Sequence, residues 1–238
     1  MQAAAGFSVI IPTLQRADGL QGVALRCARH PLVREVLVIN NAPEPLPFTD
    51  PKLRVLQQET NIFVNPAWNL GAREATGELL AIVNDDVEFA DEALTHAARI
   101  LRRGLFGIVG PDLSTFHDDG SRRISHRLAR HDAPTRRFGT FMCLRRSDYV
   151  PIPDELQIWG GDDWLIANQR RPPAALIRTP FRTDMSTTTR AAEFQRRFDA
   201  EQEALRTLLA PIRGRRWWHR AQHAHEVVRN AIHRRTDR

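Results

Sequence analysis

The feature that constrains the fold most is a repeated alternation of short apolar runs with helix-spaced segments over the first half of the chain. The apolar runs, which have strand length, span residues 7–11, 36–39, 53–56, 79–83 and 106–109. The segments with helical spacing lie near residues 20–27, 66–75 and 92–103. Apolar strands of this kind are typical of parallel sheets that are buried on both faces. The sequence therefore predicts an α/β, Rossmann-like fold with a mostly parallel sheet, helices on both faces, and ligands beyond the carboxyl ends of the strands.

The second half of the chain is less regular. The basic stretch 114–137 is interrupted by Gly120 and Pro134, and we expect an elaborated loop region there. After it we expect an apolar segment at 138–144, a helix that begins in the Trp159–Trp164 segment and ends near Gln169, a strand at 175–177, and C-terminal helices at 190–209 and 212–233.

Composition limits the class of protein. No apolar run approaches the roughly 20 residues that a membrane-spanning helix needs, and the N-terminus lacks the basic start of a signal peptide. We therefore expect a cytoplasmic protein without a transmembrane segment, or one in the host cytoplasm if the protein is viral. Cys27 and Cys143 lie far apart in apolar contexts, which predicts two buried thiols rather than a disulfide framework or a cysteine metal site.

The positive charge is unevenly distributed. The formal net charge is +6, and Lys52 is the only lysine, so arginine carries nearly all of it. Basic residues concentrate at 122–137 and 213–238. Such patches favour a polyanionic partner, either nucleic acid or an anionic membrane surface, although a solvated basic surface without a partner gives the same pattern.

Two acidic clusters carry the candidate chemistry. Asn84-Asp85-Asp86 directly follows an apolar strand, where carboxylates face the ligand-binding edge of such a sheet. Carboxylates there suit a magnesium or manganese ion that also binds phosphate oxygens, although a helix-capping turn has the same composition. Asp162-Asp163 follows a Gly-Gly pair at a predicted helix start, where one carboxylate is suited to act as a general base or only to cap the helix.

Five segments, in this order, resemble family-two glycosyltransferases of the GT-A fold. They read SVIIPTLQR, EVLVINNAP, NIFVNPAWNLGAREATGELLAIVNDDVEF, FGTFMCLRRSDY and IWGGDDW, and together they cover roughly residues 7–170. The wording of the third and fifth is also similar to small phage-encoded glycosyltransferases, some of which modify DNA. The resemblance implies a nucleotide-diphosphate sugar donor, a Mn²⁺ or Mg²⁺ cofactor and usually inversion of the anomeric centre. It implies one GT-A domain over 1–210, with a nucleotide-sugar half (about 1–112) and an acceptor half (about 113–210), followed by a basic helix over 211–238.

The same resemblance assigns the donor side of the site. The residues that match donor-binding positions are Pro12, Thr13, Arg16, Asn40, Asn61, Asn69, Gly71 and Asp85. Asn40 stands where relatives commonly have an aspartate that reads the base, which leaves the base open. Asp86 matches the aspartate that holds the metal. Asp184 takes the place of a histidine that completes the metal shell in many relatives, although an exposed loop aspartate is the alternative.

The acceptor side is assigned in the same way. Asp163 is the first choice for the base that deprotonates the acceptor hydroxyl, and Asp162 is the second. The expected acceptor-binding residues are Arg122, Arg123, Arg127, Trp159, Gly160, Gly161 and Trp164. Arginines suit phosphates, so the leading hypothesis is a polyanionic acceptor, first of all hydroxymethylated bases in DNA. The alternatives are an envelope glycan or lipid, with the C-terminal helix on the membrane, and a non-catalytic nucleic-acid-binding protein.

Overall fold

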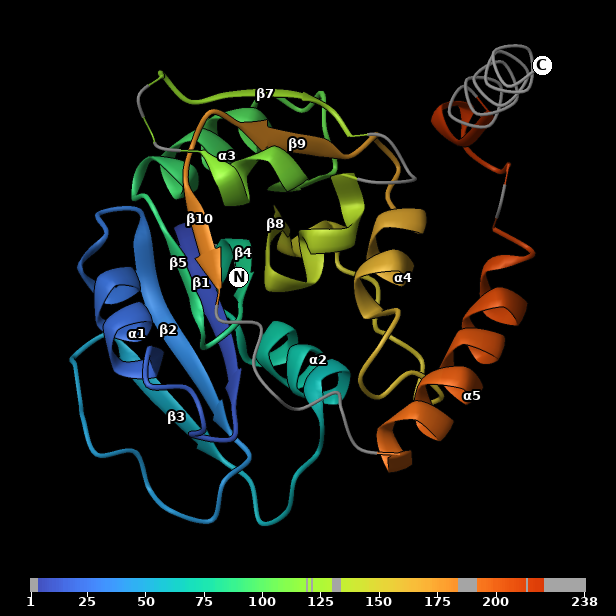
Figure 1. Ribbon diagram of the computed structural model, residues 1–238. Coiled ribbons are helices and arrows are strands. Elements are labelled where there is room, and N and C mark those ends of the chain that lie inside the picture. The colour runs from blue at the N-terminus through green and yellow to red at the C-terminus, as the bar shows by residue number, and fades with distance from the viewer. Residues whose placement is uncertain are drawn as a thin grey trace.

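The computed structural model describes residues 4–118, 120, 122–129, 134–183, 192–212 and 214–220 (Figure 1). The first half of the chain forms β1 (Ala4–Thr13), α1 (Leu20–Arg29), β2 (Val33–Asn40), β3 (Leu53–Gln57), α2 (Val64–Glu74), β4 (Gly77–Val83), β5 (Val87–Phe89), α3 (Glu92–Arg102) and β6 (Ile108–Pro111). The second half forms η1 (Leu113–His117), β7 (Ser125–Leu128), η2 (Pro134–Thr140), β8 (Phe141–Arg145), η3 (Arg146–Asp148), α4 (Gly161–Ala167), β9 (Ala174–Ile177), β10 (Phe181–Thr183) and α5 (Ala192–Leu209).

An eight-stranded sheet in the order β3-β2-β1-β4-β8-β6-β9-β7 organises the described chain. The pairings among β3, β2, β1 and β4 are parallel, as is the pairing of β6 with β9. β8 runs antiparallel to both of its neighbours, and β7 runs antiparallel to β9. The predicted α/β class with a mostly parallel sheet is confirmed. The carboxyl ends of β1, β2 and β4 lie side by side at one edge.

Helices cover both faces of the sheet, as predicted, because successive side chains on a strand point to opposite faces. Val9 and Ile11 of β1 pack into the core layer that contains α1 and α3. Ile10 packs into the layer that contains α2, α4 and α5. All three side chains are fully buried, which explains why this strand reads as a continuous apolar run.

Two strands differ from the sequence prediction. The apolar segment at 138–144 contains the antiparallel strand β8, whose direction an apolar pattern does not specify. β7 lies in the stretch that we predicted to be a polar loop region. It is the outer strand of the sheet, and an edge strand keeps polar and charged side chains without burying them.

Both cysteines are free, buried thiols, as predicted. Burial raises the pKa of the Cys27 thiol to about 12, so the neutral thiol is the stable form.

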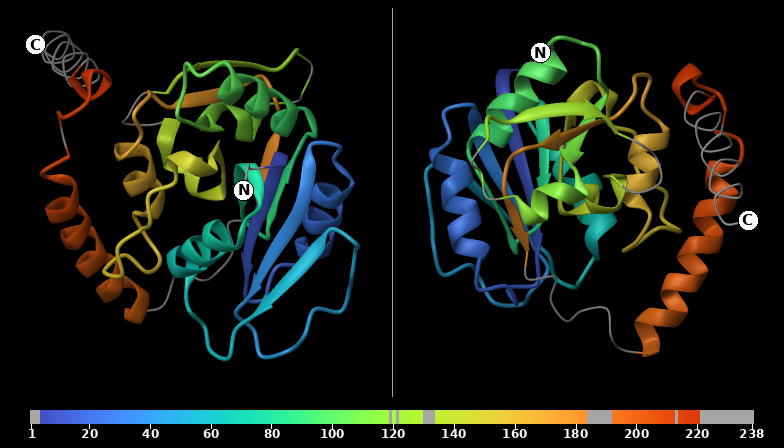
Figure 2. Two further views of the ribbon diagram at one scale, coloured as in Figure 1. Left: turned by 180° about the vertical axis from the view of Figure 1, so that it is seen from behind. Right: turned by 45° about the horizontal axis from the view of Figure 1, so that its top comes forward.

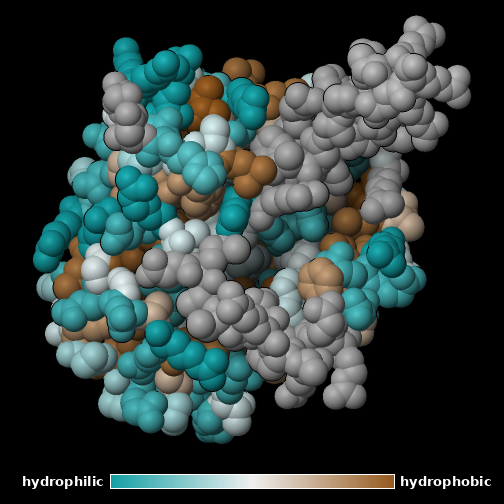
Figure 3. Space-filling view, viewed as in Figure 1, coloured by the Kyte–Doolittle hydropathy of each residue, from teal (hydrophilic) through white to brown (hydrophobic). Residues whose placement is uncertain are grey.

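The helix α5 lies alongside α4 on the outside of the molecule (Figures 1 and 2). It confirms the predicted helix at 190–209. The basic helix predicted over 211–238 lies mostly outside the described residues, which end at Arg220 in this region. Among the residues that the structure describes, no helix is long and apolar enough to cross a membrane. On the face shown in Figure 3, the hydrophobic residues drawn in colour are separated by hydrophilic ones.

Candidate active site

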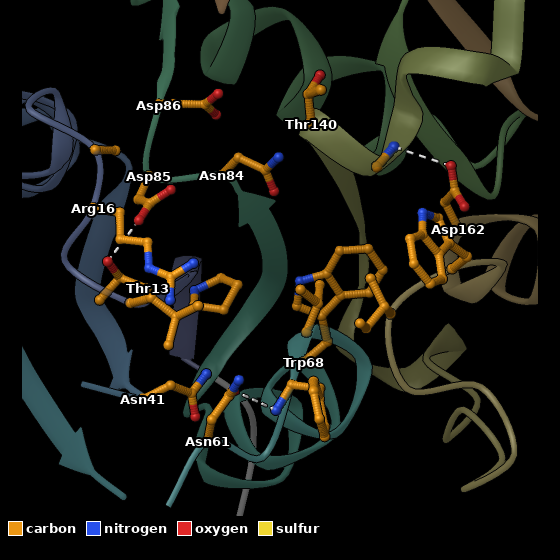
Figure 4. A pocket seen from close by; sticks show the side chains of 18 of the residues that line it. Thr13, Arg16, Asn41, Asn61, Trp68, Asn84, Asp85, Asp86, Thr140 and Asp162 are labelled. Carbon is orange, nitrogen blue, oxygen red and sulfur yellow. Dashed lines mark hydrogen bonds between the residues drawn. The ribbon is translucent and has the colours of Figure 1, made fainter. Parts of the chain in front are cut away.

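A cavity of about 550 Å³ opens at the carboxyl ends of β1, β2 and β4, where the sheet is expected to bind its ligand (Figure 4). The starts of α2 and α4 and the end of η2 complete its walls. The predicted site residues that line it are Pro12, Thr13, Arg16, Asn61, Asp85, Asp86, Trp159, Gly160 and Asp162. Both acidic clusters therefore contribute to a single cavity. Figure 4 shows Asp162 across it from Asp85 and Asp86.

Asp85 joins the ends of β1 and β4. Its Oδ2 accepts a hydrogen bond of 2.6 Å from the Thr13 hydroxyl, which in turn accepts one from the Gln15 amide. Burial raises the pKa of Asp85 to about 6; the Thr13 hydrogen bond opposes this rise, and the neighbouring Asp86 charge adds to it. Asp85 thus connects the two strand ends, of β1 and β4, that form one side of the cavity.

Asp86 presents a carboxylate oxygen that lacks a partner. Its Oδ2 accepts a hydrogen bond of 2.8 Å from the Thr183 hydroxyl, whereas its Oδ1 is buried without a hydrogen-bond partner in the described structure. A buried oxygen of this kind is costly unless a ligand or ion satisfies it. Asn84 lines the same part of the cavity and offers an amide oxygen. Asp86 and Asn84 therefore fit a hard cation such as Mg²⁺ or Mn²⁺, which keeps waters and also binds phosphate oxygens.

The remaining predicted metal ligand, Asp184, lies outside the described residues. Within the described ranges, no group of three or more histidine, cysteine, aspartate or glutamate side chains is placed to hold a metal. A cation bound by Asp86 and Asn84 would also take oxygens from a bound diphosphate and from water.

Asp162 extends into the cavity from the first turn of α4. Gly160, at the start of this helix, has a φ of +76°, a left-handed conformation that glycine adopts without strain. The Asp162 Oδ2 accepts a hydrogen bond of 3.1 Å from the Gly139 amide. Burial and then the adjacent Asp163 charge raise the pKa of Asp162 to about 7. A carboxylate of this kind suits proton transfer near neutral pH.

Asp163, our first choice for the base, is not among the residues that line the cavity. Successive residues of a helix point about 100° apart, so only one of two neighbours in the first turn need face the ligand. The structure places Asp162 in that position.

Asn40 lies behind the cavity wall rather than on it. It is fully buried, and its amide nitrogen donates to the Gln57 side chain and to the Glu44 carbonyl. Its amide oxygen accepts from the Gln15 side chain and from the Ala42 backbone. These four bonds use both amide hydrogens and both lone pairs. Asn40 therefore stabilises the loop after β2. Its side chain would have to break some of these hydrogen bonds before it could bind the base of a nucleotide.

Asn69 and Gly71 also lie outside the cavity lining. Asn69 bonds to both backbone groups of Ile152 and accepts from the Tyr149 hydroxyl, so it anchors the loop before α4. Gly71 packs on β1, because a Cβ there would lie 2.5 Å from Ile10 Cγ2. Asn69 thus acts on the cavity indirectly through hydrogen bonds, and Gly71 does so through packing.

Several predicted acceptor residues are placed away from the cavity lining. Trp164 donates its indole N–H to the Pro151 carbonyl, and Gly161 packs tightly against Asn65. Arg127 on β7 forms an ion pair of 2.6 Å with the buried Asp112. Arg122 and Arg123 are exposed just before the same edge strand. The arginine cluster thus lies on the outer edge of the sheet and contributes nothing to the cavity lining.

Sequence reasoning missed Trp68 and Asn41, which both line the cavity. The Trp68 side chain is only 3% exposed, and its indole N–H has no partner in the described structure. Figure 4 shows Trp68 between the two acidic sides of the cavity. Trp68 lies four positions after Val64 on the same face of α2, but the sequence had no feature that marked this face as part of the site.

Comparison with known proteins adds a family and a fold. The family model described as Glycosyl transferase family 2 matches residues 8–155. The structure of S. aureus TarS 1-349 aligns with a TM-score of 0.51 and 17% identity over 71% of this chain and 57% of that chain. The same protein in complex with UDP-GlcNAc aligns with a TM-score of 0.56 and 16% identity over 82% and 65% of the two chains.

GalNAc-T7 with UDP, GalNAc and Mn²⁺ aligns with a TM-score of 0.57 and 10% identity over 85% of this chain and 50% of that chain. No curated protein sequence matches the chain. The chain spans between half and two thirds of the lengths of these solved structures, and at such identities the likeness shows the fold alone.

Proposed function

This chain belongs to glycosyl transferase family 2, and we propose that it is a glycosyltransferase of the GT-A type that uses a nucleotide sugar. We further propose that its transfer is metal-dependent and inverting. The observation that carries the proposal is the position of Asp86 and Asp162 on opposite sides of one cavity. A metal ion on one side and a proton acceptor on the other match a single displacement, in which the hydroxyl attacks opposite the leaving diphosphate. Membership of an enzyme family argues against the non-catalytic alternative.

Asp86 and Asn84 would hold Mn²⁺ or Mg²⁺ together with the donor diphosphate. The bound ion would neutralise the charge that develops on the leaving diphosphate. The unpartnered Asp86 Oδ1 supports this assignment, as does the presence of Mn²⁺ and UDP in the GalNAc-T7 structure. Arg16, an exposed residue on the lining, is suited to bind a phosphate oxygen.

Asp162 would act as the general base. Its Oδ2 is oriented by the Gly139 amide, and its raised pKa means that the carboxylate binds a proton readily. A base must lie within hydrogen-bond reach of the proton that it removes, and Asp162 reaches the cavity from the wall opposite the metal side.

The pH dependence of transfer should report the ionisation of Asp162. Because its pKa is raised to about 7, the proton-accepting form is lost as the pH falls through that value, and kcat/KM should decline on the acid side. Asp163→Asn removes a neighbouring charge that raises the pKa of Asp162, so the acid limb should move to lower pH. Initial rates from pH 5 to 9 test both expectations. An acid limb that does not move in the variant would contradict the assignment.

Trp68→Phe should weaken donor binding while keeping an aromatic ring in place. If a donor oxygen accepts the unpartnered indole N–H, its loss should raise the donor KM by about tenfold, the effect of roughly one hydrogen bond. Donor titrations of initial rate measure the change, with the natural protein as reference. An unchanged KM would show that the N–H does not contact the donor.

For the acceptor, we propose a hydroxyl on a polyanion, and hydroxymethylated bases in DNA are the first candidate to test. The net charge of +6 and the exposed Arg122 and Arg123 support a polyanion. Since these arginines lie outside the cavity lining, they would contact the acceptor backbone at a distance from the reacting hydroxyl.

The decisive experiment is a panel of nucleotide sugars with Mn²⁺ or Mg²⁺, scored by release of the nucleotide diphosphate. Each donor is assayed alone, with hydroxymethylated duplex DNA and with unmodified duplex DNA. Release that requires the hydroxymethyl group supports the DNA acceptor. Metal-dependent release that modified DNA does not stimulate would reject that acceptor and retain the donor chemistry. Equal release with and without EDTA would reject metal dependence.

A further inference from the structure

A buried carboxylate of α5 holds the cavity wall that carries Asp162. Glu201 is only 4% exposed. Its Oε2 accepts hydrogen bonds from two successive backbone amides, 2.9 Å from Ile158 N and 2.8 Å from Trp159 N. Both of these residues line the cavity, whereas Glu201 does not. A buried carboxylate needs such donors, and the two amides need an acceptor, so each side satisfies the other.

Two further side chains on the same face of α5 contact the lining. The Phe198 ring packs edge-on against Trp159, with 5.3 Å between ring centroids. Leu205 packs on Gly160, where an added Cβ would lie 2.9 Å from Leu205 Cδ2. The spacing of 198, 201 and 205 places these contacts along one stripe of the helix.

Arg197, next to Phe198, extends the contact to the other wall. Its guanidinium lies over the Phe63 ring, 4.5 Å from the ring centroid, and it also donates to the Gln157 side chain. Phe63 precedes α2 and lines the cavity. The helix therefore contacts both the donor-side wall and the wall that carries Asp162.

The segment that Glu201 holds leads directly into the first turn of α4. Gly160, in its left-handed conformation, follows Trp159, and its carbonyl accepts the Trp164 amide at the start of the helix. Asp162 lies within that turn. A shift of the Ile158 and Trp159 backbone would therefore move the Asp162 carboxylate relative to the sugar.

We propose that Glu201 is a positioning residue for sugar transfer. It fixes the Ile158–Trp159 backbone, and through it the carboxylate of Asp162, without touching donor or acceptor. The inference rests on the proposed function, because it takes Asp162 to be the base. Glu201, like Asp162, lies beyond the segment matched by the family model, which ends at residue 155.

The kinetic test compares Glu201→Ala with Glu201→Gln and Glu203→Ala. Loss of the acceptor oxygen should lower kcat by about 10²-fold, the scale expected for a base displaced by about 1 Å, and leave the donor KM nearly unchanged. Gln keeps an acceptor oxygen, so Glu201→Gln should recover most of the lost rate. Glu203 lies on the same helix with its side chain 71% exposed, so Glu203→Ala is the matched control and should behave like the natural protein.

Hydrogen–deuterium exchange provides a readout that needs neither donor nor acceptor. The peptide containing Ile158 and Trp159 should exchange faster in Glu201→Ala than in the natural protein. In Glu203→Ala its exchange rate should equal that of the natural protein. If Glu201→Ala does not fold, Phe198→Ala, which removes the ring contact with Trp159, replaces it in both assays.

The outcomes separate this inference from the proposed function. A natural-level kcat in Glu201→Ala overturns the positioning role, and so does an equal loss in Glu201→Gln and Glu201→Ala. A donor KM that rises as much as kcat falls points to a general structural defect and also overturns it. If the natural protein itself transfers no sugar, the proposed function fails. The exchange measurement still tests whether Glu201 stabilises the Ile158–Trp159 backbone.

Discussion

Replacing Asp162 by asparagine should lower kcat for sugar transfer by about 10²- to 10⁴-fold, the usual contribution of a general base. Asparagine has nearly the same shape, and its oxygen can still accept the hydrogen bond from the Gly139 amide. Donor affinity should therefore change little, because donor contacts are assigned to the opposite side of the cavity. Transfer rates at saturating donor, together with donor binding by calorimetry, measure the two effects separately.

The matched control is Asp163→Asn, which changes the neighbouring carboxylate that does not line the cavity. It should keep transfer at neutral pH, apart from the shift of the acid limb described above. The opposite ranking, with a large loss in Asp163→Asn and little in Asp162→Asn, would reassign the base to Asp163.

Replacing Asp86 by alanine should lower transfer by at least about 10³-fold, because a catalytic metal contributes several kcal/mol and each 1.4 kcal/mol is a factor of ten. The reason is the loss of the carboxylate whose Oδ1 has no partner in the described structure. Unlike the Asp162 variant, this one should also lose the increase in donor affinity that we expect Mn²⁺ to give the natural protein. Calorimetric titration of a nucleoside diphosphate, with and without Mn²⁺, measures that difference.

Asp154→Ala is a suitable control for the charge change, because Asp154 is exposed and lies outside the cavity lining. Its transfer rate and Mn²⁺ response should match those of the natural protein. Mn²⁺-enhanced donor binding that survives in Asp86→Ala would place the metal elsewhere or remove it from the reaction.

The sequence predicted which strand ends meet at the cavity, because a buried parallel strand has an apolar pattern that ends abruptly. Asn84, Asp85 and Asp86 follow such a strand, and their place at the ligand-binding edge follows from that alone. Two adjacent parallel strands place Thr13 beside this turn, as the Thr13–Asp85 hydrogen bond shows.

The sequence could not decide which of two neighbouring polar residues faces the ligand. Asn40 is the last residue of β2 and Asn41 follows it. Adjacent residues of an extended chain point to opposite sides, and Asn41 is the one that lines the cavity. The choice between Asp162 and Asp163 depended in the same way on the rotation of α4. Such choices depend on local register, which a single sequence does not determine.

The arginine cluster shows a different limit. Charge along the sequence placed Arg122, Arg123 and Arg127 between the two acidic motifs, and this suggested a position near the acceptor. Pairing with β9 makes β7 the outer strand and places the cluster at the sheet edge. The position of these arginines is set by long-range strand pairing. The polar sequence of this segment does not predict that pairing.

The contact between Glu201 and the wall that carries Asp162 has a consequence for biosynthesis. A ribosome releases the two acidic motifs well before α5 emerges, so the nascent chain passes through a stage in which Ile158 and Trp159 lack their carboxylate partner. Domains generally fold as units. Catalytic competence should therefore appear only after α5 has been synthesised and has packed against this wall.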